Sequence, residues 1–417
     1  MGKNYICGLD IGTSKIAACV AEIKKGKVVD LFFESQESRG VRKGSVVDSI
    51  ELVEVIGKVL KALKAKSGIN IKFVYANICG QDVITKHSRA IIPLAERGNK
   101  VINSLDVDNV ITQASILGST IEDEVIHQIP YSFTVDNKTE ITNPVGLYGH
   151  KLEVDLYLVC AKLSSVQTIS YAIHQAGYDA KEILFSGLAT SEAVFDEKLK
   201  TGSNILCDIG YDITEIIFFK DGFLRDIKIL PVGGSDLTRA LQEGLNIPFE
   251  LAKEIKISYG SLDDRELLDD NNQILVRNDN AYQPIKKKQV ADILNAKTKS
   301  SCLYLKDIVE KTVPLNEISH FELTGRTILQ EGFLEMLEAN IGLPVELARI
   351  RDPQLAPIVN NNAALSGRKY LTFATALGLI CKELYNYSPK SLATPKPSRN
   401  PLTKALNKLK EVYLEYF

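Results

Sequence analysis

The sequence predicts an α/β protein in which one folding unit, three strands followed by a helix, occurs twice. The first copy begins near Tyr5 and the second near Asn204. Each copy carries the tripeptide Asp-x-Gly at its first turn. Equivalent turns of two duplicated units can face one another, so we expect a cleft between the copies with both tripeptides at its edges.

Short apolar runs separated by tight turns define the two copies. In the first copy we expect strands at 5–11, 16–23, 28–34 and 73–79, and a helix at 50–65. In the second copy we expect strands at 204–209, 214–219 and 223–232, and a helix at 236–244. The pair Asp221-Gly222 is typical of a two-residue hairpin turn between the last two of these strands.

Residues 84–163 do not follow this pattern. They contain an expected helix at 104–118 and expected strands at 124–135 and 151–160. We therefore expect a small separate module inserted into the first copy.

The composition excludes several classes of protein. The chain has 417 residues, 45% of them hydrophobic and 24% charged, with a net charge of −2, so it lacks the basic excess of a nucleic-acid-binding protein. The seven cysteines show no Cys-x-x-Cys spacing, which argues against a disulfide framework or a zinc site. No stretch approaches the roughly 18 consecutive apolar residues of a spanning helix. Any membrane contact is therefore expected to be peripheral.

The first turn has the features of a phosphate and magnesium site. Asp10 precedes the run Gly12, Thr13, Ser14 and Lys15. Glycine lets the backbone approach a ligand closely, and consecutive amides of a turn attract an anion. The two hydroxyls and the lysine could bind phosphate, and Asp10 could hold Mg²⁺ through water. The motif is short, and an ordinary hairpin is the alternative.

The second turn repeats the motif as Asp208 and Gly210, with Thr214 four residues further on. Two such turns facing one cleft would each contribute a carboxylate and a set of amides to the same phosphates. Asp208 is therefore predicted to share the magnesium ion with Asp10. This combination is more specific than either turn alone.

A third element ends another apolar strand. Thr324, Gly325 and Arg326 follow the expected strand residues Phe321 to Leu323. A strand that ends in Thr-Gly before a helix can bring its backbone against adenosine. A plain helix-start turn is the alternative.

These three elements, in this order, resemble the actin, Hsp70 and sugar-kinase superfamily. Within it, the chain resembles the bacterial FtsA family over essentially its whole length. Three stretches carry this likeness: 125–130 with 143–149 in the inserted module, 231–238 with 252–260 after the second turn, and the C-terminal tail. The resemblance implies actin-like duplicated ribonuclease-H-like domains around a nucleotide cleft, with an FtsA-type inserted subdomain.

The resemblance also implies how the chain is divided. Subdomain 1A would comprise 1–83, 164–195 and about 372–387, and the inserted subdomain 1C would comprise 84–163. Subdomain 2A would comprise 196–244 and 312–371, and subdomain 2B would comprise 245–311. A flexible linker at 388–401 and an amphipathic helix at 402–417 would follow.

Further cleft residues follow from the resemblance. Gly233 and Gly234 would lie by the nucleotide, and the helix that carries Lys256 would line the cleft. The chain departs from the family where Tyr211 and Asp212 replace small residues of a glycine-rich run. Arg326 and Thr327 likewise replace the later glycines of the adenosine motif. These bulkier residues limit the approach of backbone to ligand, so we expect slow hydrolysis at most.

A carboxylate that activates water is hard to find in the sequence. Residues 184–193 offer only Glu192, for which a helix-surface position is the alternative. We therefore assign no catalytic residue.

The tail is predicted to bind a membrane surface. Residues 388–401 contain four prolines and are expected to form a linker. On a helix, residues 402–417 separate into an apolar face and a polar face. The apolar face carries Leu402, Leu406, Leu409, Tyr413, Tyr416 and Phe417, and the polar face includes Lys404 and Lys408. Six Lys or Arg against two Glu in 386–417 favour anionic lipid, whereas docking on the protein's own core is the alternative.

By resemblance, the protein would bind ATP with Mg²⁺, assemble with itself, and attach the tubulin-like FtsZ to the membrane during septal ring assembly. Its partners would be FtsZ, further copies of itself, anionic lipids and later divisome proteins, but no nucleic acid. It would lie on the cytoplasmic face of the cell membrane at the division site. The alternatives are an actin-like pilus-assembly ATPase and a small-molecule kinase of the same superfamily.

Overall fold

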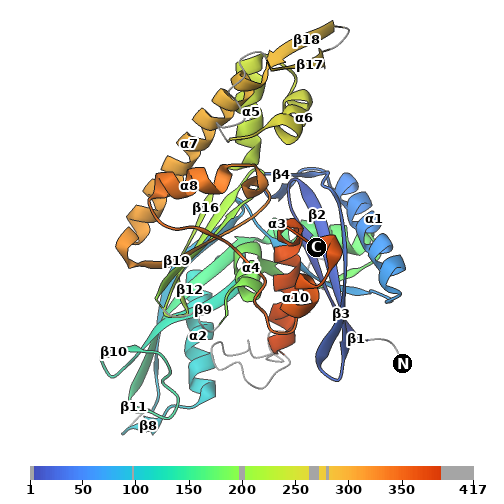
Figure 1. Cartoon of the computed structure of the whole chain (residues 1–417). Helices are drawn as coiled ribbons and strands as arrows, with labels where there is room; N and C mark the ends of the chain where they lie inside the picture. The colour runs from blue at the N-terminus through green and yellow to red at the C-terminus, as the bar shows by residue number, and fades with distance from the viewer. Residues whose placement is uncertain (1–3, 96–97, 197–201, 263–271, 279–280, 387–417) are drawn as a thin grey trace. The chain divides into compact units, whose positions relative to one another are not determined.

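The computed structural model describes residues 4–95, 98–196, 202–262, 272–278 and 281–386 (Figure 1). Contacts divide the chain into two compact units. The described residues of the first unit lie within 1–84, 122–126 and 161–384, and those of the second lie within 85–121, 127–160 and 385–386. All three predicted nucleotide elements belong to the first unit.

The first unit contains two five-stranded sheets with the same topology. In the first sheet the spatial order is β13-β6-β1-β2-β3. Three strands form an antiparallel meander, and two further strands add in parallel. The strands are β1 (Asn4–Ile11), β2 (Lys15–Lys24), β3 (Lys27–Glu37), β6 (Phe73–Ile78) and β13 (Asp179–Phe185).

The second sheet repeats this order as β16-β15-β14-β19-β20. Its meander is again antiparallel, and its last two strands again run parallel to the first. The strands are β14 (Ser203–Ile209), β15 (Thr214–Lys220), β16 (Phe223–Leu230), β19 (Ile318–Thr324) and β20 (Glu346–Leu347). The duplication that the sequence predicts is therefore present, and each predicted strand ends within three residues of the observed one.

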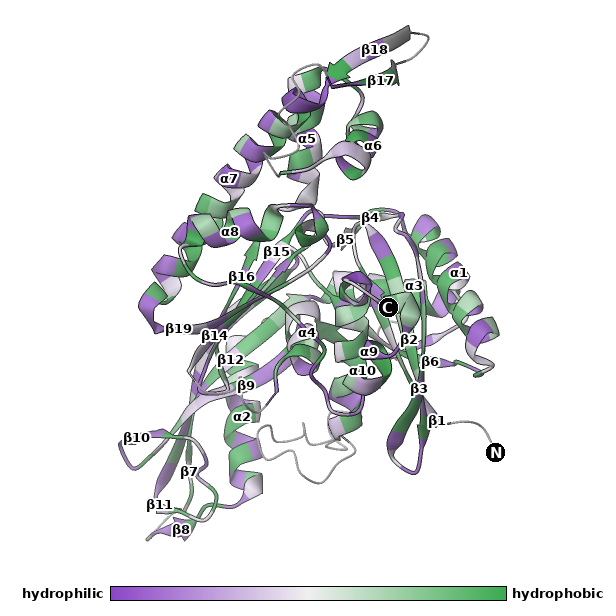
Figure 2. Cartoon of the chain, in the orientation of Figure 1, coloured by the Kyte–Doolittle hydropathy of each residue, from purple (hydrophilic) through white to green (hydrophobic). Residues whose placement is uncertain are grey.

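The alternation of side chains along β14 decides where the polar residues point. Ile205, Cys207 and Ile209 pack into the apolar core of the second half. Because neighbouring residues of a strand face opposite sides, Asp208 lies on the other face of the sheet. β1 and β2 are apolar along most of their length (Figure 2). The cysteines are free thiols and most are buried, as predicted.

Short connections and helices cover the sheets. α1 (Ser49–Ser67) begins at Asp48, whose carboxylate accepts from two backbone amides, and it ends at Gly68 in the left-handed conformation. The other helices are α3 (Leu163–Gln175), α4 (Ser186–Val194), α5 (Gly234–Leu245), α6 (Phe249–Tyr259), α7 (Lys287–Thr312), α8 (Phe333–Ile341), α9 (Ala356–Asn360) and α10 (Ala374–Asn386). Two small hairpins are β4 (Val41–Arg42) with β5 (Ser45–Val46), and β17 (Gln273–Asn278) with β18 (Ala281–Lys286). Single 3₁₀ turns occur at η3 (Leu315–Glu317), η4 (Thr327–Leu329), η5 (Ala363–Leu365) and η6 (Lys369–Phe373).

Two helix starts differ from the sequence prediction. α5 begins at Gly234 rather than at Asp236, because the Asp236 carboxylate accepts from the Gly233 amide and caps an earlier first turn. After Thr324 and Gly325 the chain forms the 3₁₀ turn η4, and the α-helix α8 starts only at Phe333.

The second unit is built on a four-stranded sheet of order β10-β9-β12-β7. α2 (Ser104–Gly118) has the predicted bounds, and a capping box between Asn103 and Asp106 fixes its first turn. The strands of the sheet are β7 (Val83–Pro93), β9 (Asp123–Val135), β10 (Lys138–Ile141) and β12 (Lys151–Lys162), and a separate ladder joins β8 (Lys100–Val101) to β11 (Tyr148–Gly149).

The predicted linker at 388–401 and the predicted membrane helix at 402–417 lie outside the described residues. Among the residues that are described, no helix is both long and apolar enough to cross a bilayer.

The contact between α10 and α4 is close enough to require glycine. A Cβ at Gly378 would lie 1.8 Å from the carbonyl oxygen of Ala189. We expect Gly378→Ala to lower the free energy of unfolding by about 1–3 kcal/mol, because one of the two helices must shift. Gly57→Ala is the matched control, since nothing lies within 4 Å of its Cβ in α1 and alanine favours a helix by about 0.5–1 kcal/mol.

Urea unfolding followed by circular dichroism measures both variants. Equal effects of the two substitutions would contradict the close contact.

Candidate functional site

Two turns of the same design meet at the candidate site. In the first turn the Gly12 amide donates to the Lys15 carbonyl over 3.0 Å, and in the second the Gly210 amide donates to the Ile213 carbonyl over 2.9 Å. The aspartates just before the turns lie close together, since the Asp10 carboxylate contributes to a raised pKa of Asp208. The structure thus brings together the two Asp-x-Gly tripeptides that the sequence singled out.

Asp10 is buried and held by two side chains. One carboxylate oxygen receives the Lys15 ammonium at 2.5 Å, and the other accepts from the Asn77 amide at 3.0 Å. The Asn77 carbonyl oxygen in turn accepts from the Ile11 backbone over 2.6 Å. The positive charge of Lys15, predicted to meet phosphate, is therefore directed at Asp10 in this structure.

Asp208 contacts the third predicted element. A Cβ at Gly325 would lie 2.5 Å from a carboxylate oxygen of Asp208, and Gly325 has a positive φ of 97°. Only glycine allows this approach without strain. Burial and then the neighbouring Asp10 raise the pKa of Asp208 to about 6, although Lys15 opposes the shift.

Glu215 is a third carboxylate at this place, and the sequence analysis missed it. It stands on β15 directly opposite Asp208, and its side chain is only 4% exposed. Its two carboxylate oxygens accept from the Ser186 hydroxyl at 2.9 and 2.8 Å. Ser186 is the first residue of α4, so this bond ties Glu215 of the second half to the start of a helix of the first half.

The electrostatics of Glu215 follow from this position. Burial and then the Asp208 and Asp10 carboxylates raise its pKa to about 8, while the Ser186 hydroxyl favours the ionised form. We call Asp10, Asp208 and Glu215 the carboxylate floor. Only the Lys15 ammonium pairs with a member of this floor among the described residues. When all are ionised, the floor and Lys15 together carry two surplus negative charges.

The strand pairing contains the signal that would have revealed Glu215. Around the second turn, Ile209 pairs with Thr214 and Asp208 with Glu215, so the side chains of the latter pair share one face. In the first copy, the residue opposite Asp10 is Ala17. The carboxylate is thus present in one copy only, and comparing the two Asp-x-Gly motifs does not find it.

Thr324 lies beside Asp208 in the parallel register of β14 and β19. Its hydroxyl oxygen is buried and has no hydrogen-bond partner within the part of the chain that the structure describes. A buried polar group of this kind is normally satisfied, so its position next to the carboxylate floor fits a ligand or water held there.

The glycines before α5 pack against the second turn. The amides of Gly234 and Ser235 donate to the carbonyls of Gly210 and Tyr211 over 3.1 and 2.7 Å. A Cβ at Gly233 would lie 2.6 Å from the same two carbonyl oxygens. The first amides of α5, predicted to lie by the nucleotide, are therefore bonded to protein in this structure.

Lys256 and Arg326 bring positive charge to the same region. The Lys256 ammonium donates to the Gly234 carbonyl at 2.6 Å and lies 5.3 Å from the centre of the Tyr211 ring. Burial, and then Lys253 and Arg326, lower the pKa of Lys256 to about 8. A buried lysine beside two further cations is poorly neutralised, and such a cluster favours an anionic ligand.

Two hydroxyls near the second turn are bonded to the backbone. Thr214 is buried and donates to the Val232 carbonyl at 2.8 Å, and Thr327 donates to the Gly210 carbonyl at 2.6 Å. The predicted contact between Thr214 and phosphate stays a prediction. On the first turn, Ser14 accepts from the Ser38 amide through its backbone carbonyl, and Thr13 accepts from Gly44 through its hydroxyl.

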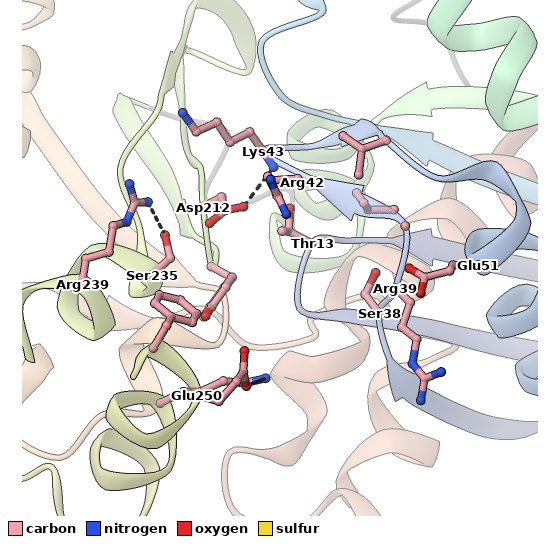
Figure 3. A pocket seen from close by; sticks show the side chains of 16 residues that line it. Thr13, Ser38, Arg39, Arg42, Lys43, Glu51, Asp212, Ser235, Arg239 and Glu250 are labelled. Atoms are coloured by element: carbon pink, nitrogen blue, oxygen red, sulfur yellow. Dashed lines mark hydrogen bonds and ion pairs between the residues drawn. The ribbon is translucent and has the colours of Figure 1, made fainter. Parts of the chain in front are cut away.

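A cavity of about 610 Å³ opens beside both turns (Figure 3). Thr13 of the first turn and Tyr211 with Asp212 of the second lie in its wall. Its lining carries five cations against three carboxylates, which leaves a surplus of two positive charges. The cations come from β4, the loops beside it, α5 and α6, and are Arg39, Arg42, Lys43, Arg239 and Lys253; the carboxylates are Glu51, Asp212 and Glu250. The volume and charge suit a phosphorylated small molecule.

The donor set suits a hydrated magnesium ion rather than a directly chelated one. Carboxylate oxygens are ligands that Mg²⁺ prefers, and the surplus of two negative charges matches its charge. Within the described ranges, no group of three or more His, Cys, Asp or Glu side chains is placed to hold a metal ion directly. This is compatible with the expectation that water stands between the ion and the two aspartates.

Glu192 does not belong to the site. It lies on α4, is exposed, and pairs with Lys382 of α10 at 3.4 Å. The helix-surface alternative for this residue is therefore the observed one.

Comparison of this chain with models of known protein families identifies the family to which it belongs. Residues 80–160 match the family model described as the SHS2 domain inserted in FtsA, and residues 205–378 match the model of cell division protein FtsA. Together the two matches span more than half of the chain. The chain belongs to the FtsA family.

Curated FtsA proteins match along most of their length. The protein of Borreliella burgdorferi is 27% identical over 420 residues, which cover 98% of this chain and 96% of that protein. The protein of Pseudomonas aeruginosa is 26% identical, with 82% of each chain covered. The FtsA-type resemblance inferred from sequence is confirmed.

Solved structures show that the fold is actin-like. The PilM–PilN type IV pilus biogenesis complex superposes with a TM-score of 0.64 at 16% identity, covering 91% of this chain and 98% of that chain. MreB5 of Spiroplasma citri bound to ADP superposes with a TM-score of 0.51 at 10% identity, covering 92% and 98%. The predicted fold class is confirmed, and the FtsA-specific family matches favour the division protein over the pilus alternative.

The raised pKa of Glu215 predicts how stability depends on pH. Between the ordinary carboxyl value of 4.5 and about 8, the folded protein keeps a proton that the unfolded chain releases. This group therefore makes the folded state less stable as pH rises, by at most about 1.4 kcal/mol per pH unit. Glu215→Gln removes the titration, so we expect its stability advantage over the unsubstituted protein to grow from pH 5 to pH 8.

Urea unfolding in the presence of EDTA measures this difference. Glu192→Gln, on the exposed surface of α4, is the control. A pH-independent difference for Glu215→Gln would show that this carboxyl titrates normally.

Proposed function

We propose that this FtsA-family chain is an actin-like ATP-binding scaffold that attaches the FtsZ ring to the cytoplasmic face of the cell membrane and supports septal ring assembly. One observation carries the nucleotide part of the proposal. The carboxylate floor lies at the two Asp-x-Gly turns, and residues of both turns, Thr13, Tyr211 and Asp212, line a cavity with a surplus of positive charge. The negative charge of the carboxylate floor suits a magnesium ion, and the positive charge of the cavity lining suits phosphate groups.

The roles of individual residues follow from their positions. Asp10 and Asp208 would hold hydrated Mg²⁺, and Glu215 would add a third negative charge below it. Gly12 and Gly210 would bring backbone amides to the phosphates, and Lys15 would exchange its bond to Asp10 for one to phosphate. Lys256 and Arg326 would balance further phosphate charge.

Magnesium neutralises phosphate charge when it is bound, and the residues of this chain decide how much hydrolysis follows. The first amides of α5 are bonded to Gly210 and Tyr211, and the Thr327 hydroxyl is bonded to Gly210. Donors that are already bonded cannot stabilise a transferring phosphoryl group unless the structure rearranges. We therefore propose slow ATP hydrolysis at most, with nucleotide binding rather than turnover as the working event.

The C-terminal segment supplies the membrane part of the proposal. An amphipathic helix at 402–417 would bury about six large apolar side chains, which stabilises binding by several kcal/mol at ~25 cal/mol per Å². Each basic residue near an anionic surface adds about 1 kcal/mol. Ordering the helix offsets part of this gain. A single copy would thus bind reversibly.

Self-assembly would strengthen membrane attachment. When several copies are joined, the tails act at a high effective concentration, and the assembly stays bound although each tail dissociates. The proposed partners are accordingly further copies of this chain, anionic lipids, FtsZ and later divisome proteins.

The carboxylate floor can be tested by removing one charge. We expect Asp208→Asn to weaken binding of ATP in the presence of Mg²⁺ by roughly 10–100-fold, because the aspartate orients the hydrated ion. Without Mg²⁺ the same substitution leaves ATP binding equal or tighter, since a negative charge near the phosphates is lost. Titration of a fluorescent ATP analogue with and without Mg²⁺ measures both.

Glu317→Gln is the control for a lost surface carboxylate, because Glu317 is exposed and pairs only with Lys220 among the described residues. A magnesium-independent affinity in the unsubstituted protein would contradict the proposed ion site.

The tail can be tested by liposome sedimentation. We expect the full chain to pellet with vesicles that contain phosphatidylserine, more completely with ATP, and we expect removal of residues 402–417 to abolish pelleting. Leu406→Asp and Asn407→Asp form a matched pair, since each adds one negative charge but only Leu406 lies on the predicted apolar face. Leu406→Asp is expected to abolish binding, and Asn407→Asp to weaken it by about fivefold, the effect of one charge.

If both substitutions weaken pelleting equally, the tail binds by charge alone. If removal of 402–417 leaves pelleting unchanged, the proposed anchor is wrong.

A further inference from the structure

The small hairpin β4–β5 stands between the two Asp-x-Gly turns. Its tip consists of Lys43 and Gly44, whose φ angles are 49° and 76°. Two consecutive positive φ angles are typical of the tight turn that joins two antiparallel strands. A positive φ is unfavourable for a residue that carries a side chain, so the contacts around Lys43 must hold its backbone in this conformation.

Two consecutive amides at this tip bond to opposite halves of the duplicated fold. The Lys43 amide donates to the Asp212 carboxylate at 2.9 Å, and Figure 3 draws this bond. The Gly44 amide donates to the Thr13 hydroxyl at 3.2 Å. Thr13 belongs to the first turn and Asp212 to the second, so two consecutive peptide units of the hairpin tip join both turns.

The tip is also packed against both halves. A Cβ at Gly44 would lie 2.8 Å from Cα of Gly80 and 2.9 Å from Cδ1 of Ile213. Gly80 follows β6 of the first sheet, and Ile213 lies in the second turn. No larger residue fits at the tip without moving one of the two halves.

The base of the hairpin is fixed to Asp82. The Ser45 hydroxyl donates to Oδ2 of Asp82 at 2.6 Å, and the Ser165 hydroxyl donates to the same oxygen at 3.0 Å. The Lys162 ammonium lies 3.0 Å from the other oxygen. Burial opposes the charge of Asp82, but the bonds from Ser45, Lys162 and Ser165 together hold its pKa below the ordinary value.

Asp82 also has a special place along the chain. The second unit begins after Ile84, and its segment at 127–160 ends just before Ala161. Asp82 and Lys162 therefore lie at the two ends of the insertion, and the Lys162 amide donates to the Asp82 carbonyl at 3.0 Å. The hairpin is thus bonded at its tip to both nucleotide turns and at its base to the root of the inserted unit.

We propose that the β4–β5 hairpin is a brace that sets the spacing of the two Asp-x-Gly turns for nucleotide binding, with Asp212 and Asp82 as its positioning residues. The inference rests on the proposed function of the cleft. It also gives a role to Asp212, a carboxylate that would repel phosphate. The Asp212 carboxylate accepts from the Lys43 amide and so holds the tip of the hairpin. Loosening either anchor would change the spacing of the turns and weaken nucleotide binding.

A matched pair of serines tests the base of the brace. Ser45→Ala and Ser165→Ala each remove one hydroxyl from the same Asp82 oxygen, but only Ser45 stands on the brace. We expect Ser45→Ala to weaken binding of ATP in the presence of Mg²⁺ by about 3–10-fold, the effect of one lost hydrogen bond. Ser165→Ala should leave the affinity within about twofold of the unsubstituted protein.

A conservative pair tests the tip. Asp212→Ala removes the acceptor of the Lys43 amide, whereas Asp212→Asn keeps an acceptor oxygen and removes the charge. We expect weaker binding for Asp212→Ala and rescue by Asp212→Asn, whose affinity should equal or exceed that of the unsubstituted protein. Hydrogen exchange at the Lys43 amide should accelerate in Asp212→Ala and Ser45→Ala only, which separates loosening of the brace from general unfolding.

The outcomes distinguish the brace from the function on which it rests. If the unsubstituted protein binds no ATP, the proposed function fails and the brace has no nucleotide to position. If it binds ATP but Ser45→Ala and Ser165→Ala bind equally, the brace is wrong and the nucleotide site stands. If Asp212→Asn weakens binding as much as Asp212→Ala, charge rather than positioning explains Asp212, and the brace is again wrong.

Discussion

The clustering of three carboxyl groups, with one lysine paired to Asp10, is the constraint on which the first unit depends. Two of them, Asp208 and Glu215, stand directly opposite each other on paired strands, an arrangement that destabilises a sheet when both are charged. The fold tolerates them because Ser186 donates to Glu215 and because Glu215, with a pKa of about 8, keeps its proton at neutral pH. A site that is poorly neutralised by its own protein is well prepared for a divalent cation.

The two halves of the first unit are joined at two places. At the first place, Glu215 of the second half accepts from the hydroxyl of Ser186, the first residue of α4 in the first half. At the second place, the tip of the β4–β5 hairpin holds Thr13 and Asp212 together. The carboxylate floor and the cavity therefore lie near connections that are short, polar and specific. Such connections keep the spacing of the two turns well defined.

Local features were predictable from the sequence, and features that depend on register were not. The hairpin at Asp221 and Gly222 follows from residues that accept positive φ, and both indeed have it. Glu215 was missed because its position depends on which residue pairs with Asp208 across a turn. The bond from Thr214 to Val232 was equally hidden, since a hydroxyl near a turn can serve the backbone as readily as a ligand. The brace joins residues some 170 positions apart, from Lys43 to Asp212, and no local pattern reports such a contact.

The close contact between Gly378 of α10 and Ala189 of α4 has a mechanical consequence. α10 is the last described element before the C-terminal segment, and it touches α4 backbone to backbone. The Thr190 and Thr375 hydroxyls bond across the same contact at 3.0 Å. One turn before Ala189, α4 begins at Ser186, whose hydroxyl donates to Glu215. A force on the chain beyond Asn386 would therefore be transmitted through α10 and α4 to the bond between Ser186 and Glu215. Tension at the C-terminal segment and ligand binding in the cleft would then act on the same hydrogen bonds.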